Sequence, residues 1–205
     1  MHSSPQAGYD VVVLAGGAGR RLGGLDKAGL EVGNRALLDR VLGACGGAGR
    51  IVVVGPRRDI GQPIRWTRED PAGGGPVAGL AAGLPLTSAA VVVVLAVDLP
   101  FLTAATVDRL AAAAAADGRS DGAILVDATG RDQPLIAAYR RRALVRRLRE
   151  LTEPAGASIS SLIRDLDLVR LPDLDAAGAD CDTWAELERA RARANSEGGP
   201  DEPAR

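Results

Sequence analysis

The chain has 205 residues, of which 46% are hydrophobic and 25% charged, and its formal net charge is −1. This balanced charge and the 2% aromatic content exclude a broad basic surface for nucleic acid or an anionic membrane, and a stacking platform for single strands. The only histidine, His2, lies in a polar N-terminal segment, which excludes Ser-His-Asp hydrolysis, Cys-His proteolysis and histidine-ligated zinc and leaves Asp, Lys, Arg, backbone amides and a hard metal ion for chemistry.

Apolar runs rich in β-branched residues alternate with Ala- and Leu-rich stretches, which predicts an α/β fold with a mostly parallel sheet and helices on both faces. The unbroken hydrophobicity of VVVL, IVVV and VVVVLAV is typical of strands that are buried on both faces. We expect strands at residues 10–14, 50–54, 64–67, 90–97, 122–126 and 134–139. We expect helices at residues 36–44, 77–84, 104–116, 141–151, 160–165 and 184–194.

We expect one domain over residues 9–194, whose last helix begins at the capping box Thr183-Trp184-Ala185-Glu186. Residues 1–8 and 195–205 are polar or rich in Gly and Pro, and we expect both segments to be disordered tails. The N-terminal segment lacks the features of a signal peptide, and the longest apolar run is too short to cross a bilayer. Because Cys45 and Cys181 share no metal-ligand spacing, we interpret them as reduced thiols and expect a cytoplasmic protein.

The first predicted strand runs directly into a glycine-rich, cationic loop, VVVLAGGAGRRLGGLDK, at residues 11–27. Gly16 and Gly17 place no large side chain between the backbone and a ligand, so that amide groups can converge on phosphate oxygens. Three residues add fixed positive charge to the same loop: Arg20, Arg21 and Lys27. The pattern predicts a binding site for a polyphosphate, with an ordinary glycine-rich turn as the alternative.

The spacing in this loop excludes two common phosphate-binding motifs. A Walker-type loop needs Gly-Lys-Ser/Thr, whereas Lys27 lies between Asp26 and Ala28. The dinucleotide fingerprint G-x-G-x-x-G, started at Gly17, needs a glycine where the chain has Leu22. Two arginines and a lysine also suit a triphosphate better than the bridge of a dinucleotide.

Further candidate residues follow other predicted strands, since Asp98 ends VVVVLAV and Gly55 follows IVVV. Open parallel sheets bind ligands beyond the carboxyl ends of their strands. A carboxylate that ends an apolar strand needs a partner, and Thr103 is the better cap for the next helix. One or two carboxylates together with substrate phosphates are the usual ligands of Mg²⁺, so Asp98 is the key candidate carboxylate.

The segment LAGGAGRRLGGLDK resembles the signature L-A-G-G-x-x-x-R-x-G-G-x-D-K of the MobA-like nucleotidyltransferases. Four later segments match the family in the same order: REDPAGGGPVAGLAAGL, LAVDLPFL, RDQPLIAAYR and DCDTWAEL. The resemblance covers the chain from Tyr9 to about Arg193. It implies a Rossmann-like nucleotidyltransferase fold in three α/β/α layers.

Within the family, the resemblance is greatest to the enzymes that add guanylate to the molybdenum cofactor. It implies Mg²⁺-dependent transfer, with Mn²⁺ as a substitute ion, of GMP from GTP to the terminal phosphate of molybdopterin, with release of pyrophosphate. The implied partners are GTP, this phosphorylated acceptor and, in transient contacts, other molybdenum cofactor proteins. The alternatives are a cytidylyltransferase for the same cofactor, a transferase for another phosphorylated acceptor, and a non-catalytic nucleotide-binding module.

Two short patterns indicate which nucleotide base the protein binds. LAGG after the first strand and GPVAG before the second predicted helix resemble the guanylyl enzymes, whereas Gly55 replaces an asparagine of the better-known pattern. The segment Arg131-Asp132-Gln133-Pro134 resembles the pterin-facing motif of the family, although several surface loops read similarly.

The resemblance also assigns roles to individual residues. It implies catalytic roles for Arg21, Lys27 and Asp98, with Lys27 in a solvent-facing loop, and metal binding by Asp98 and Asp182. Asp70 is assigned to the guanine–ribose side of the nucleotide. The complete implied nucleotide-binding set is Leu14, Ala15, Gly16, Gly17, Lys27, Asp70, Gly79 and Asp98.

Asp180 and Asp182 form a second pair of carboxylates near the end of the chain. In an extended segment both side chains would point the same way, and related transferases place such a residue across the metal from the strand-end aspartate. Asp182 also precedes a capped helix, where its charge would favour the N-terminal dipole. Both interpretations stay open at the level of sequence.

Overall fold

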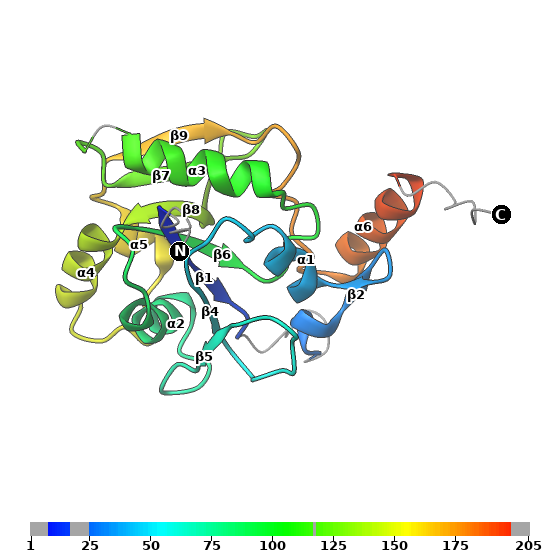
Figure 1. Cartoon of the computed structure of the whole chain (residues 1–205), viewed down its shortest axis with the longest axis horizontal. Helices are drawn as coiled ribbons and strands as arrows, with labels where there is room; N and C mark the ends of the chain where they lie inside the picture. The colour runs from blue at the N-terminus through cyan, green and yellow to red at the C-terminus, as the bar shows by residue number, and fades with distance from the viewer. Residues whose placement is uncertain (1–7, 17–24, 117, 198–205) are drawn as a thin grey trace, which may run out of the picture.

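The computed structural model describes residues 8–16, 25–116 and 118–197. A seven-stranded sheet of order β5-β4-β1-β6-β8-β7-β9 forms its centre (Figure 1). Only β8 runs antiparallel to its neighbours, so the predicted mostly parallel sheet is confirmed. The strands are β1 (Tyr9–Leu14), β4 (Ile51–Val54), β5 (Arg65–Thr67), β6 (Val91–Ala96), β7 (Gly122–Val126), β8 (Asp132–Arg140) and β9 (Leu168–Pro172).

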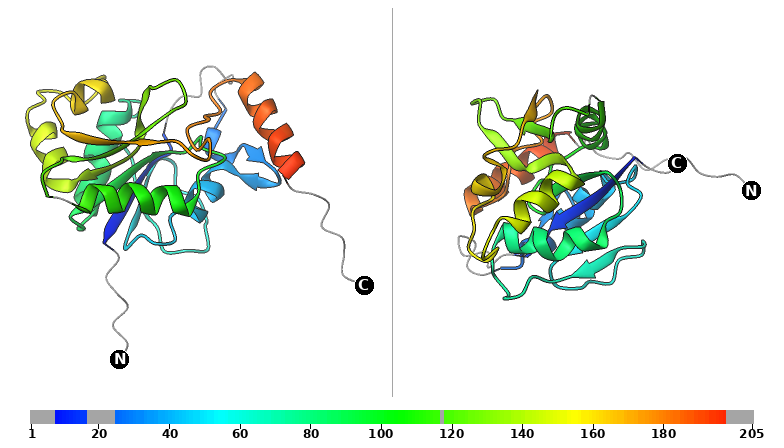
Figure 2. Two further views of the ribbon diagram at one scale, coloured as in Figure 1. Left: turned by 90° about the horizontal axis from the view of Figure 1, so that it is seen from above. Right: turned by 90° about the vertical axis from the view of Figure 1, so that its left-hand side faces the viewer.

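Helices cover both faces of this sheet, which gives the three layers that the sequence predicts (Figure 2). Alternate residues of β1 separate the two cores: Val11 and Val13 pack with α1 and α3, whereas Val12 and Leu14 pack with α2, α4 and α5. The helices are α1 (Leu37–Gly43), α2 (Pro76–Gly83), α3 (Ala104–Ala116), α4 (Arg141–Arg149), α5 (Ile159–Ile163) and α6 (Trp184–Glu197). The described residues also include two 3₁₀ turns, η2 (Lys27–Gly29) and η3 (Leu84–Leu86).

A small hairpin, which the sequence analysis missed, packs against α6 at one end of the molecule (Figures 1 and 2). Its strands are β2 (Glu31–Val32) and β3 (Arg35–Ala36). Gly33 and Asn34 form the turn with φ of 55° and 58°, the left-handed values that a tight two-residue hairpin requires. The two elements bury a separate apolar cluster, which holds the segment before α6 close to the main sheet.

Two details differ from the expected elements. β9 is missing from the predicted strands because LVRLP is only half-buried at the edge of the sheet and shows no strong apolar run. The expected C-terminal tail begins too early, since α6 continues through Glu197 and residues 195–197 are helical. The remaining residues of the two expected tails lie outside the described residues: 1–7 at the N-terminus and 198–205 at the C-terminus. Within the described ranges, no helix combines the length and the apolar character that a membrane span needs.

Candidate active site

The carboxyl ends of three adjacent parallel strands bring the predicted site residues to one edge of the sheet. Leu14 ends β1 and is followed by Ala15 and Gly16, Gly55 follows β4, and Asp98 comes two residues after β6. Because β4, β1 and β6 are neighbours in the sheet, these positions meet at the same edge, as the sequence predicts. Three further predicted residues of the loop lie outside the described residues: Gly17, Arg20 and Arg21.

Lys27 lies at the centre of this edge, on the turn η2 that the Asp26 carboxylate caps through the Ala28 amide. Its Nζ donates a hydrogen bond to Asp98 Oδ2 at 2.8 Å and a second one to Asp182 Oδ1. Leu25 and Asp26 are exposed, as expected for a solvent-facing loop, but the Lys27 side chain itself is only 20% exposed. The two carboxylates draw the ammonium group inward, and we call these three residues the lysine–carboxylate cluster.

The protonation of Lys27 follows from the same contacts. Burial alone would lower the pKa of the ammonium group, because it disfavours the charged form. The charges of Asp98 and Asp182 and their hydrogen bonds outweigh burial and raise the pKa above its ordinary value. Lys27 therefore stays charged at neutral pH, and its single positive charge is shared by the two carboxylates.

A backbone contact brings Asp182 to Asp98 across the chain. The amide of Cys181, whose side chain is fully buried, donates to the Asp98 carbonyl oxygen at 3.1 Å. The predicted capping box is confirmed, since the Glu186 amide donates to Thr183 Oγ1 while Glu186 Oε2 accepts from the Thr183 amide at 2.7 Å. Glu186 also accepts from the Asp182 amide, so the cap of α6 does not use the Asp182 carboxylate. That carboxylate faces Lys27 instead, which favours the functional interpretation.

Asp180 lies beside the cluster without joining it. The Asp180 side chain forms no hydrogen bond or ion pair with any described residue, and the 180–182 segment is not a strand. Partial burial, followed by the negative charges of Asp182 and Asp98, raises the pKa of this carboxyl. The site therefore carries more negative charge than Lys27 alone offsets.

The cluster can accept a hard cation together with phosphates. No group of three or more His, Cys, Asp or Glu side chains in the described part of the chain is arranged to hold a metal ion alone. Mg²⁺ does not require such a cage, because one or two carboxylates and substrate phosphates suffice. Asp98 and Asp182 already share one positive charge, so the residues present fit an ion that arrives with its nucleotide.

Sequence reasoning missed Glu69, which lies in the loop after β5 and approaches Gly16 at the end of β1. A Cβ atom placed on Gly16 would lie 3.0 Å from Glu69 Oε1, so this carboxylate closely approaches the backbone after β1. The same oxygen accepts the Gly73 amide at 3.1 Å. Its neighbour Asp70, the predicted residue, is exposed in the same loop and forms no hydrogen bond or ion pair within the described ranges.

Close packing accounts for two glycines of the motifs. A Cβ atom on Gly79 of α2 would lie 3.1 Å from Leu14 Cδ2, so this glycine lets α2 approach the end of β1. A Cβ atom on Gly55 would lie 2.9 Å from the carbonyl carbon of Ala15, which leaves no room for asparagine on this backbone. The departure at Gly55 is therefore matched to the path of the β1 loop.

A cavity of about 490 Å³ adjoins the turn that carries Lys27 and was not predicted. Arg58 in its wall forms an ion pair with Asp26, the residue that caps η2. The cavity is lined by Arg57, Arg58, Asp59, Ile60, Gln62, Ile64 and Trp66. One wall of the cavity is thus tied to the position of Lys27.

The segment that resembles a pterin-facing motif begins β8, whose antiparallel direction places its start at the same edge of the sheet. Asp127 accepts the Thr129 hydroxyl, the Arg131 amide and, at 2.8 Å, Gln133 Nε2. These bonds, led by that of Thr129, lower the pKa of Asp127 to about 2. Asp132 pairs with Arg170 at 2.9 Å, so the motif residues are fixed in the β7–β8 turn.

Comparison with known proteins places this geometry in a family. The model of the MobA-like NTP transferase domain matches residues 11–170. A molybdenum cofactor guanylyltransferase from Acidiphilium cryptum is 31% identical over 194 residues, which cover 88% of this chain and 93% of that protein. Another from Mesorhizobium japonicum is 38% identical over 141 residues, covering 62% and 65% of the two chains.

Solved structures share the fold. Molybdopterin-guanine dinucleotide biosynthesis protein A from Archaeoglobus fulgidus superimposes with a TM-score of 0.70 at 23% identity. The match covers 91% of this chain and 99% of that one. Since its identity is low, this likeness supports the three-layer architecture and not a particular substrate.

Proposed function

This chain belongs to the family of MobA-like NTP transferase domains, and from that premise we propose that it transfers GMP from GTP to the terminal phosphate of molybdopterin, releasing pyrophosphate. The proposal is supported by relatives that carry the name molybdenum cofactor guanylyltransferase across most of the chain length. The observation that carries it is Lys27 held between Asp98 and Asp182 at the carboxyl edge of the sheet.

The reaction needs positioning and charge compensation more than proton transfer. An oxygen of the acceptor phosphate attacks the α-phosphorus of GTP in line, and the bond from that phosphorus to the bridging oxygen breaks. Pyrophosphate leaves with the electron pair of that bond. A phosphate acceptor is already anionic at neutral pH, so no general base is required, and the protein contributes orientation and electrostatic stabilisation.

Lys27 is the residue that links the resting cluster to a bound triphosphate. Its ammonium group offsets Asp98 and Asp182 in the absence of substrate, and it can exchange these partners for phosphate oxygens by rotation of its flexible stem. The pKa of Lys27 lies above its ordinary value, so it donates to the phosphates as a cation. We assign the remaining triphosphate contacts to Arg21 and to the backbone amides of Gly16 and Gly17.

Asp98 and Asp182 are the residues that would hold Mg²⁺, or Mn²⁺ in its place, when Lys27 moves to the phosphates. Such an ion would supply Lewis-acid chemistry, that is, polarisation of the α-phosphate and charge compensation for the leaving pyrophosphate. Asp98 is fixed for this role by its position at the end of a buried strand, and Asp182 by the capped start of α6. We also propose a cytoplasmic location, because Cys45 and Cys181 are both free thiols.

One assay tests the reaction and the choice of base together. Purified chain, Mo-molybdopterin and Mg²⁺ are incubated with α-labelled GTP or CTP, and the labelled dinucleotide product is separated by chromatography. We expect label to pass from GTP to the acceptor at a much higher rate than from CTP. Preferential transfer from CTP would establish the cytidylyl alternative and give Gly55 a role in base choice, and nucleotide binding without transfer from either would leave only a binding module.

A further inference from the structure

A second anionic ligand site is suggested by a basin at the opposite end of the sheet from the lysine–carboxylate cluster. The basin has a volume of about 830 Å³ and lies between the start of β6 and the outer side of α4. It is lined by Ser88, Ala89, Ala90, Val145, Glu150 and five arginines, Arg140, Arg141, Arg142, Arg146 and Arg149. We call it the arginine basin.

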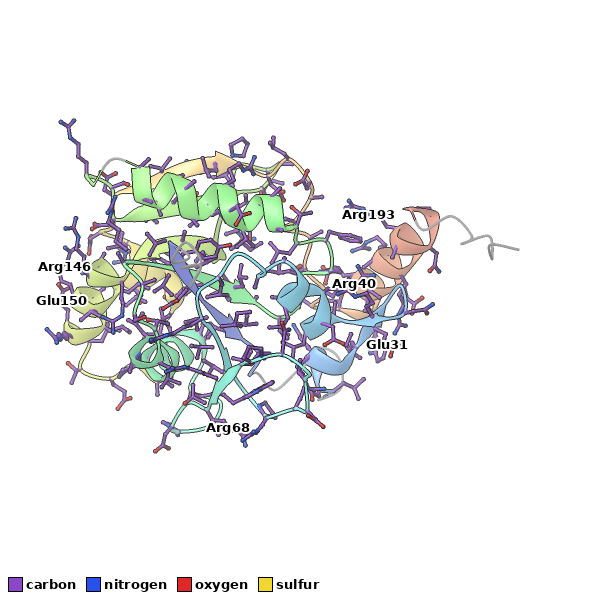
Figure 3. All side chains as sticks on the ribbon, viewed as in Figure 1. Glu31, Arg40, Arg68, Arg146, Glu150 and Arg193 are labelled. Carbon is purple, nitrogen blue, oxygen red and sulfur yellow. The ribbon has the colours of Figure 1, made fainter. Side chains whose placement is uncertain are left out.

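The length of β6 separates the arginine basin from the proposed active site. Ala90 precedes β6, and Arg140 is paired with Val91 in the sheet, so both mark the amino-terminal end of that strand. Six residues of β6 span about 20 Å at the usual rise of ~3.3 Å per residue, and Asp98 lies beyond its other end. Figure 3 shows Arg146 and Glu150 on α4, on the opposite side of the molecule from Arg40 and Arg193.

The charge of the basin is unusual for this chain. Five arginines face a single glutamate in its lining, whereas the whole chain has a formal net charge of −1. Asp121 offsets part of this charge, since it lies 3.3 Å from Arg146. Asp10 is buried directly behind the lining, where it accepts the Ser88 and Ala89 amides at 2.6 and 2.9 Å, so the five arginines are set against three acidic residues, Glu150, Asp121 and Asp10. A concave surface lined by one sign of charge concentrates ligands of the opposite sign.

Four of the five guanidinium groups are anchored by hydrogen bonds and still have N–H donors available for a ligand. Arg140, Arg141, Arg142 and Arg146 each donate to a fixed acceptor, namely the Ser120 carbonyl, Thr87 Oγ1, the Gly118 carbonyl and Asp121. A guanidinium has five N–H donors, so most donors remain open to a ligand. Arg149 is exposed and forms no hydrogen bond or ion pair with the described residues. The four anchored arginines are preorganised and lose little entropy when a ligand binds, whereas Arg149 would have to be ordered by the ligand.

We propose that the arginine basin binds a small polyphosphate anion, a class that includes inorganic polyphosphates and the phosphate chain of nucleotides. Guanidinium forks match phosphate oxygens with paired hydrogen bonds. The volume lies within the range of about 300–1,000 Å³ that small-ligand sites occupy. Ala89, Ala90 and Val145 add apolar surface to the lining.

The test is a titration of the full chain with inorganic tripolyphosphate in about 150 mM NaCl, followed by two-dimensional amide NMR. Because the phosphate loop should also bind this probe, site-resolved signals are needed. We expect saturable shifts at the amides of residues 88–90 and 141–150, in addition to those near residues 14–16 and 27–29. Absence of saturable shifts in the first group would overturn the proposal.

Two pairs of substitutions separate specific binding from general charge. Arg146→Gln with Arg149→Gln should weaken binding at the basin at least tenfold, whereas Arg65→Gln with Arg189→Gln removes the same charge from exposed positions elsewhere and should change it less than twofold. Equal weakening by both pairs would reduce the effect to net charge and overturn the site. If the first pair does not fold, Arg146→Lys with Arg149→Lys keeps the charge but not the forks, and unchanged affinity in that pair would contradict recognition by guanidinium groups.

Two controls fix the ligand class and the independence of the site. GTP and pyrophosphate should shift the same basin amides as tripolyphosphate, which identifies the phosphate chain as the recognised group. Tighter binding of hexaglutamate than of tripolyphosphate at these amides would overturn the proposal in favour of an acidic protein partner. The Arg146→Gln/Arg149→Gln variant should retain its shifts near residues 27–29, and their loss would show that the two regions are not separate sites.

Discussion

Two aspartates at opposite ends of the central strands differ in a way that separates structure from function. Asp10 lies near the start of β1, is 2% exposed, and accepts two backbone amides, those of Ser88 and Ala89. Asp98 lies beyond the end of β6, keeps 15% of its side chain exposed, and shares the Lys27 ammonium with Asp182. Backbone amides cannot leave their acceptor, whereas a lysine on a flexible stem can.

This difference in partners is the basis for our proposal that the reaction takes place at the carboxyl end of the sheet. At Asp10 the carboxylate oxygen accepts two backbone amides, and these hydrogen bonds hold the junction before β6 in place. At Asp98 the partner is a lysine on a flexible stem, and we propose that phosphates take Lys27 while a cation takes its place. A strand-end carboxylate therefore indicates a ligand site when it lies at the carboxyl end of a parallel strand and its partner can move.

The largest effect that would sharpen this contrast is expected for Asp98→Asn. The substitution keeps the shape of the side chain but removes the charge that would hold a hard cation against the phosphates. We expect kcat/KM for GMP transfer to fall by about 100-fold or more, which is ~2.7 kcal/mol or more in transition-state stabilisation. Steady-state assays over a range of Mg²⁺ and Mn²⁺ would measure it, with circular dichroism to confirm folding. Full activity at ordinary Mg²⁺ would remove Asp98 from the reaction.

Lys27→Ala should have the next largest effect, on binding of the nucleotide. Loss of a charge-assisted contact to phosphate costs about 1.5–3 kcal/mol. Isothermal titration with GTP should show this weakening, while titration with Mn²⁺ alone should show tighter binding than in the wild type, because Asp98 and Asp182 lose their ammonium partner. GTP affinity equal to that of the wild type would exclude Lys27 from the phosphate site.

Asp10→Ala tests the other end of the comparison. It leaves two amides without an acceptor in a buried place, which should lower the free energy of unfolding by about 1–3 kcal/mol. Urea denaturation measures the loss, and kcat/KM of the folded fraction should stay within about twofold of the wild type. A loss of activity as large as that of Asp98→Asn would break the distinction between the two aspartates.

A smaller effect is expected for Asp182→Asn. The cap of α6 uses Thr183 and Glu186, so the helix should keep its stability. Lys27 would lose one of its two carboxylate partners, and we expect kcat/KM to fall about tenfold or less, which is at most ~1.4 kcal/mol. Activity assays of the variant would check the fall in kcat/KM, and thermal unfolding would check that the stability of the helix is kept. A large drop in thermal stability would show that the carboxylate serves the helix rather than the site.

Asp180→Asn should produce the smallest change. We expect this change in the way the free energy of unfolding depends on pH. The pKa of Asp180 is raised in the folded state, so the native protein holds this proton more tightly and loses stability as the pH rises through the ordinary range of an aspartate, about 4, and above. The variant lacks this loss, so it should gain stability relative to the wild type between pH 4 and 7, by less than about 1 kcal/mol for a partly solvated group. Parallel urea curves at the two pH values would detect it, and a relative loss in the variant would have the wrong sign.

The sequence was sufficient for the elements with strong apolar periodicity and for the residues that end them. Buried runs such as Val91–Ala96 predict the strand. They also predict the edge of the sheet at which Asp98 lies near Gly16, the residue that follows β1 and Ala15. β9 and the β2–β3 hairpin escaped because their residues are few or half-exposed, although the Gly33-Asn34 pair is a turn signal that could have indicated the hairpin.

Contacts between the site residues were harder to predict than the residues themselves. Lys27 and Asp182 are separated by 155 positions, and their contact depends on the burial of Cys181 and the docking of α6 against the hairpin. Glu69 approaches Gly16 because the β5 loop folds back over the end of β1, which no local pattern records. Motif resemblance therefore identified Lys27, Asp98 and Asp182 one by one, whereas only the fold joined them into one cluster.

The measurement that tests the account most directly is a double-mutant cycle on kcat/KM for GMP transfer from GTP. It compares the wild type, Lys27→Ala, Asp98→Asn and the double variant under the same Mg²⁺ concentration. Residues that act as one unit give strongly non-additive effects, so the double variant should be little worse than the poorer single variant. Effects that simply add in free energy would contradict the central claim that Lys27 and Asp98 exchange partners within one catalytic cluster.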